Sequence, residues 1–133
     1  MKINRILWIG LLVVVISLIG CDTGVGPTGP TNAPVLTAVA VSPQQANPGA
    51  IIIFSIVFTD IPGDLNGGTA VITDNQGGNY QGVVSNAEGT SGTLTTSIEL
   101  SPLLSPGQLV FNIYVVDRAG NPSNIVPTTI IIL

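Results

Sequence analysis

The chain has 133 residues, of which only 8% are charged, and it contains no histidine. This length is enough for about one domain with a buried core. The lack of histidine removes the commonest general acid and base, and a net charge of −4 makes nucleic acid a poor partner. We therefore expect one acidic domain that is not an enzyme and needs no cofactor for catalysis.

The first twenty residues have the layout of a secretory signal. Lys2 and Arg5 precede an apolar run over residues 6–19 that carries no charge. As a helix this run would be roughly 21 Å long at about 1.5 Å per residue, too short for a hydrocarbon core of about 30 Å. The pattern therefore predicts a signal helix within a cleaved peptide of residues 1–20, not a membrane-spanning helix.

Cys21 is the only cysteine, and it directly follows Leu18, Ile19 and Gly20. This tetrapeptide resembles the lipobox of bacterial lipoproteins, in which the cysteine receives diacylglycerol before the signal is removed. The resemblance implies lipidation of Cys21 and a membrane anchor in the bacterial cell envelope, with the protein facing the periplasm or the exterior. Each buried methylene of such an anchor contributes about 0.8 kcal/mol. The alternative is an ordinary signal peptide that happens to end near a cysteine.

Residues 21–34 are rich in glycine and proline and show no apolar periodicity, which predicts a flexible tether. Signal removal would leave Arg118 as the only basic side chain against seven acids. Anionic lipid headgroups are therefore poor partners for the surface of the mature protein, apart from its anchor.

From Val35 to the end, short β-rich runs alternate with clusters of Gly, Pro and Asn, and no window favours a helix. Seven runs with this spacing predict an all-β antiparallel sandwich over residues 35–133. The predicted strands cover residues 35–42, 50–59, 69–74, 80–85, 92–100, 108–117 and 124–133.

Alternation of apolar and polar residues predicts which face of a strand is buried. The second run is apolar on both faces, because Ile51, Ile53 and Val57 lie opposite its core residues, and this favours a central strand. The fifth run should have one wet face. The predicted core consists of Ile52, Phe54, Ile56, Phe58, Leu94, Thr96, Ile98, Leu100, Leu109, Phe111, Ile113 and Val115.

The last run contains Pro127, which cannot donate a hydrogen bond to a neighbouring strand, so we expect an edge position or a bulge there. The terminal residues 130–133 are all apolar. We expect them to form a buried final strand, because four residues are too few to span a membrane.

Three segments resemble bacterial immunoglobulin-like domains of surface proteins. They are Ala40-Val41-Ser42-Pro43 with Pro48-Gly49, Phe58-Thr59-Asp60 with Gly63-Asp64-Leu65, and Tyr114-Val115-Val116-Asp117-Arg118-Ala119-Gly120-Asn121. The resemblance implies an immunoglobulin-like sandwich whose last two strands are joined by a tight Asp-x-Ala-Gly-Asn connection. It also implies a spacer or adhesive module. Antigen-receptor recognition is not implied, since the chain has no cysteine pair and its one tryptophan, Trp8, lies in the signal.

Three functions compete. The first is a lipid-anchored envelope protein whose immunoglobulin-like module binds an unknown protein or polysaccharide, or has a structural role. The second is a carbohydrate-binding or adhesin module at the cell surface, which would need exposed aromatic platforms beyond Tyr80 and Tyr114. The third is an enzyme, for which only the Asp60 and Asp64 carboxylates could act as acid and base; a solvated turn explains that pair better.

The acids also predict a metal site. In this fold the connection between the second and third strands lies at the same end as the connection between the last two. Asp60 and Asp64 belong to the first connection and Asp117 to the second, with Asn66 and Asn121 nearby in sequence. Three carboxylates would repel one another unless neutralised, and calcium prefers hard oxygen ligands. The alternative is that Arg118 or solvent compensates the charge and Asp117 only bonds to its own turn.

Overall fold

The computed structural model describes residues 32–61 and 63–133. The predicted signal peptide over residues 1–20 and the predicted lipidation site Cys21 lie outside the described residues, as does most of the predicted tether. The described residues form eight strands. Within these two ranges no helix is long and apolar enough to cross a membrane.

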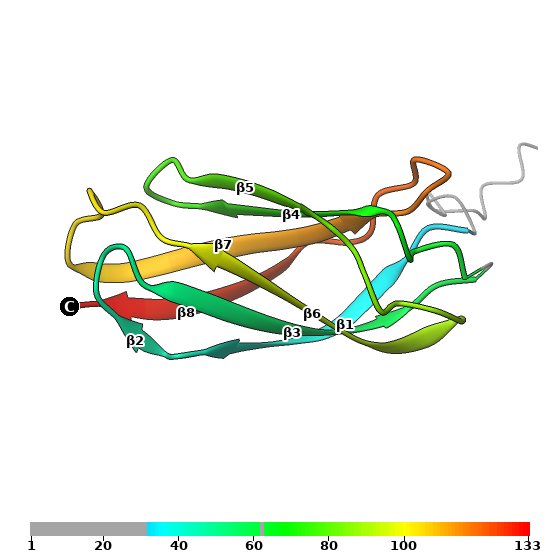
Figure 1. Ribbon diagram of the computed structural model, residues 1–133, viewed down its shortest axis with the longest axis horizontal. Coiled ribbons are helices and arrows are strands. Elements are labelled where there is room, and N and C mark those ends of the chain that lie inside the picture. Colours follow the sequence, from blue (N-terminus) through cyan, green and yellow to red (C-terminus); the bar gives the residue numbers. More distant parts are fainter. Residues whose placement is uncertain (1–31, 62) are drawn as a thin grey trace, which may run out of the picture.

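Two sheets pack face to face in a β-sandwich (Figure 1). The first has the order β1-β3-β6, with β1 at Val35–Ser42, β3 at Ile51–Thr59 and β6 at Ser91–Glu99. The second has the order β2-β8-β7-β4-β5, which are Gln45–Ala46, Val126–Ile132, Gly107–Val116, Thr69–Asp74 and Asn79–Val83. The all-β prediction is confirmed, and the seven predicted runs match observed strands with ends that differ by one or two residues at most.

The eighth strand, β2, was not predicted. It has two residues, and it pairs in parallel with Ile131 and Ile132 at the end of β8. Two residues are too few to show an alternating pattern in the sequence. The pairing forms only because the chain crosses from one sheet to the other after β1.

The core lies between the sheets and is built by the alternating residues of β3 and β7. Phe54 and Phe111 are both 0% exposed, and their rings meet edge to face with centroids 5.2 Å apart. The core prediction holds except at Thr96, which is only half-buried. The reason is that β6 is an edge strand and faces Gly82 of β5, which has no side chain to cover the threonine.

The predictions for individual strands can be compared with the sheet order. β3 is central in its sheet, as expected, but Ile51 remains 62% exposed because no third layer covers the outer face. Pro127 pairs with Asn112 of β7, and β2 covers β8 only at Ile131 and Ile132, so the proline occupies an edge segment as predicted. The terminal run is buried at Ile130 and Ile132.

The start of β1, the β3–β4 loop and the β7–β8 connection lie at the same end of the sandwich (Figure 1). Val35, the first residue of β1, pairs with Thr59, the last residue of β3. The β7–β8 connection reaches the same place, where Asn124 accepts a hydrogen bond from the Leu36 amide at 2.7 Å and donates one to the Leu36 carbonyl at 2.9 Å. The asparagine side chain thus pairs with β1 in the way a neighbouring strand would.

Candidate functional site

Asp60 is the first residue after β3 and is 0% exposed. Its position follows from alternation, because Phe58 points into the core and the residue two places on faces the same side. The Asp60 amide donates to the Thr90 carbonyl at 2.8 Å, which fixes the backbone at the end of the β3–β6 pairing. The chain therefore places a carboxylate where the strand pattern would otherwise place an apolar side chain.

Asp64 lies in the loop between β3 and β4, which is held against the core by the fully buried Leu65. The loop closes through a hydrogen bond from the Gly68 amide to the Leu65 carbonyl at 2.9 Å. Gly68 is required by close packing, since a Cβ there would collide with the Val116 carbonyl. The Arg118 amide also donates to the Asp64 carbonyl at 3.3 Å. These contacts join the β3–β4 loop directly to the end of β7.

Asp117 follows β7 and organises the turn after it. One of its oxygens accepts a hydrogen bond from the Asn121 amide at 2.8 Å, and the other accepts one from the Asn121 side chain at 2.9 Å. The Gly120 amide donates to the Asp117 carbonyl, and Gly120 has a φ of 90°, in the left-handed region that favours glycine. This is the tight Asp-x-Ala-Gly-Asn connection that the family resemblance implied.

The structure brings the three predicted acids together. One carboxylate oxygen from each of Asp60, Asp64 and Asp117 lies within 4.8 Å of the other two. Asp60 and Asp117 are buried and Asp64 is half-buried. Of the two neighbouring asparagines, Asn121 is bonded to Asp117, whereas the Asn66 side chain donates to Glu88 at 3.3 Å. Asn66 is therefore directed to another partner.

Several carboxylate oxygens of this cluster have no hydrogen-bond partner in the protein. Neither oxygen of Asp60 has a hydrogen-bond partner, and the same is true of the buried Oδ1 of Asp64. Burial raises the pKa of Asp60, and the charges of Asp64 and Asp117 raise it further. The backbone amides of Leu65 and Asp64 lower this pKa in part, but neither reaches hydrogen-bond geometry. Arg118 is exposed to solvent.

Asp74 provides a comparison within the same domain, although no pattern in the sequence singles it out. It is 9% exposed, and its Oδ1 accepts hydrogen bonds from the Gln76 and Gly78 amides, both at 2.8 Å. Its Oδ2 accepts a bond from the Tyr80 hydroxyl at 3.2 Å. Burial and the Asp74 carboxylate both raise the pKa of Tyr80. A buried aspartate whose role is structural is thus fully bonded here, which Asp60 is not.

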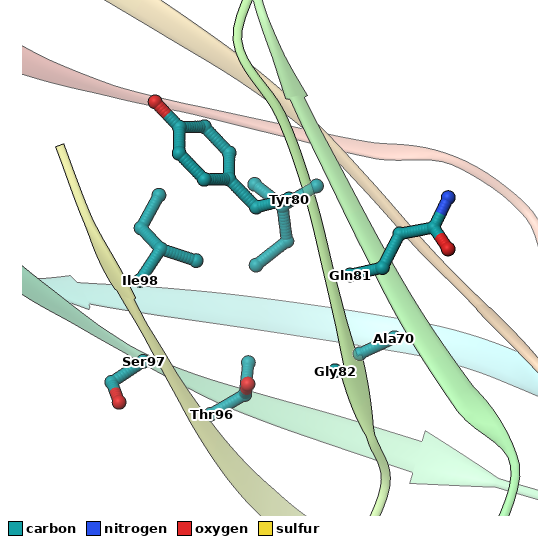
Figure 2. A pocket seen from close by; sticks show the side chains of 8 residues that line it. Ala70, Tyr80, Gln81, Gly82, Thr96, Ser97 and Ile98 are labelled. Atoms are coloured by element: carbon teal, nitrogen blue, oxygen red, sulfur yellow. The ribbon is translucent and has the colours of Figure 1, made fainter. Parts of the chain in front are cut away.

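A small cleft lies between β6 and the β4–β5 hairpin (Figure 2). It has room for about one water molecule. None of its lining side chains is an acid or a base, apart from the Tyr80 phenol. The residues that line it are Ala70, Ile72, Tyr80, Gln81, Gly82, Thr96, Ser97 and Ile98. A cleft of this size and chemistry is a packing gap at the sandwich edge, so the acid cluster is the stronger candidate for a functional site.

No family model matches this chain, and no curated protein sequence matches it either. Among solved structures, it is similar to the PKD domain of an M14-like peptidase from a Thermoplasmatales archaeon, at 19% identity over 76% of this chain and 97% of that chain, with a TM-score of 0.50. It is also similar to a Niemann-Pick type C2 protein from the Japanese carpenter ant, at 9% identity over 77% and 94% of the two chains, with a TM-score of 0.52.

Such low identities establish the fold alone. The sheet β1-β3-β6 matches strands A, B and E of the immunoglobulin fold, and β8-β7-β4 matches strands G, F and C. By its sheet order and its structural neighbours, the domain is an immunoglobulin-like β-sandwich.

Proposed function

We propose that this chain is a lipid-anchored protein of the bacterial cell envelope whose immunoglobulin-like sandwich is a binding or structural module without catalytic activity. The observation that carries the proposal is the place where the chain enters the domain. β1 begins at Val35, shortly after the lipobox-like Leu18-Ile19-Gly20-Cys21 and its Gly/Pro tether, and it begins at one end of an elongated sandwich (Figure 1). An anchor on Cys21 would leave the opposite end of the domain pointing away from the membrane.

The aromatic side chains favour this proposal over a carbohydrate-binding module. Phe54, Phe58 and Phe111 are at most 1% exposed, so none offers a ring to a sugar. Tyr80 is half-buried against the core, and its hydroxyl is bonded to Asp74. Sugar-binding surfaces depend on flat, exposed aromatic rings, and within residues 32–61 and 63–133 only Tyr114 is left for such a role.

The anchor is tested by Cys21→Ser in the full chain, expressed in a bacterial host with labelled fatty acid. We expect loss of label, retention of the uncleaved signal and a shift in detergent partitioning. Asp22→Asn, one residue away, is the matched control and should be labelled and processed like the parent. A Cys21→Ser protein that is still labelled and processed would disprove lipidation at this residue.

A further inference from the structure

The Asp60 carboxylate has no counterpart in the rest of the described structure. It is completely buried, both of its oxygens lack a hydrogen-bond partner, and two other carboxylates lie beside it. An ionised carboxylate removed from water is costly unless it is paired or coordinates a metal. Asp74 shows that this fold can satisfy a buried aspartate with backbone amides where it needs one for structure. The two unpaired oxygens of Asp60 therefore point to a ligand from outside the chain.

The spacing of the oxygens fits a calcium ion. Calcium binds carboxylate oxygens at about 2.3–2.6 Å, so one ion can contact oxygens that lie up to about 5 Å apart. The three oxygens lie within 4.8 Å of one another. We propose that Asp60, Asp64 and Asp117 bind one calcium ion at the end of the sandwich where β1 begins. This site is independent of the lipid anchor and goes beyond the function proposed above.

Hydrogen bonds fix the main chain of each ligand before the ion arrives, and in Asp117 they fix the side chain as well. Asp117 is oriented by two hydrogen bonds from Asn121, and each of its oxygens keeps a second lone pair for a cation. The main chain of Asp64 is fixed by the Arg118 amide, and that of Asp60 by the Thr90 carbonyl. Water can complete the coordination on the side of the half-buried Asp64.

Binding would cross-link two connections of the domain. Asp60 and Asp64 belong to the β3–β4 loop and Asp117 to the β7–β8 connection. Existing hydrogen bonds already join two further segments to these connections: the Asp60 amide bonds to Thr90, which precedes β6, and Asn124 bonds to Leu36 of β1. Calcium would therefore stabilise the end of the domain at which the tether joins it.

A proton is the competitor for this site. In the absence of a cation, a proton on Asp60 would remove the cost of a buried negative charge. If Asp60 is only a buried neutral acid, calcium leaves the stability of the domain unchanged at constant pH. If the cluster binds calcium, the ion displaces the proton from Asp60 and raises that stability. The two explanations are therefore separated by adding the ion.

The test uses the full chain purified in a nonionic detergent at neutral pH, with millimolar calcium or with chelator. Isothermal titration calorimetry should give one calcium per chain. At a hundredfold excess over the dissociation constant, the thermal midpoint followed by circular dichroism should rise by about 10 °C. Magnesium should raise it less, because it demands a tighter octahedral geometry and dehydrates reluctantly.

Asp60→Asn should abolish the calcium response, and Asp64→Asn, at a more exposed position, tests the site if the first variant does not fold. Asp74→Asn is the matched control, since it alters a buried aspartate outside the cluster and should keep the full response. The proposal would be overturned if millimolar calcium neither shifted the thermal midpoint of the parent protein nor produced a heat of binding in calorimetry. An undiminished response in both cluster variants, or an equal response to magnesium, would also overturn it.

Discussion

Phe111→Ala is the sharpest test of the packing that holds the two sheets together. Phe111 of β7 is 0% exposed and meets Phe54 of β3 with the ring planes at 86°. Because the two rings come from opposite sheets, removing one leaves a void at the centre of the sandwich. β7 is paired on both sides, with β4 and β8, so the backbone around the void has little freedom to collapse.

The cost follows from this burial. A Phe→Ala change in a core typically costs about 3–5 kcal/mol, and the lost edge-to-face contact accounts for about 0.5–1.5 kcal/mol of that. We expect about 4 kcal/mol here. A domain of about 100 residues unfolds with an entropy near 2.1 cal/mol/K per residue, so the midpoint should fall by about 15–20 °C. Since small domains have only about 5–15 kcal/mol in total, the variant should be close to unfolding at physiological temperature.

The assay is thermal and urea unfolding of the full chain in detergent, followed by circular dichroism. Leu103→Ala is the control, because Leu103 is 90% exposed and its loss should change the free energy of unfolding by no more than about 0.5 kcal/mol. A double-mutant cycle with Phe54→Ala should give a coupling energy of about 1 kcal/mol. If Phe111→Ala is as stable as Leu103→Ala, the assignment of this face of β7 to the core is refuted.

Two further predictions concern the end of the domain where the chain enters. Asn124→Ala removes both hydrogen bonds to the Leu36 backbone and should cost about 1–3 kcal/mol, measured by urea unfolding, whereas an unchanged midpoint would show that water replaces the side chain. The second prediction concerns the pH dependence of stability in the presence of chelator. The pKa of Asp60 in the folded state lies above its reference value of 3.8. The stability linked to protonation of Asp60 is therefore complete below pH 3.8, and it is lost as the pH rises through the higher folded-state pKa. The thermal midpoint of the parent relative to Asp60→Asn should therefore rise as pH is lowered from neutral toward 3.8. The charges that act on Asp60 are those of Asp64 and Asp117, and a pH-independent difference would contradict the burial of an ionisable Asp60.

The sequence alone determined the strands and most of the core. Alternation has a period of two residues and is a local property, so the buried faces of β3 and β7 could be read before any strand was placed. The turn after β7 was also local, because Asp117 and Asn121 bond to each other over four residues. Even the meeting of Asp60 and Asp64 with Asp117 could be predicted, since the order of strands in this fold places both loops at one end.

Tertiary structure decided what no local pattern carries. The short β2 depends on the end of β8, and the exposure of Thr96 depends on a glycine in the opposite sheet. The sequence shows that Asp60, Asp64 and Asp74 are acids, but not that Asp74 is satisfied by amides and a phenol whereas Asp60 is buried without a partner. Burial and hydrogen bonding of a side chain depend on segments far apart in the chain, and only packing brings these segments together.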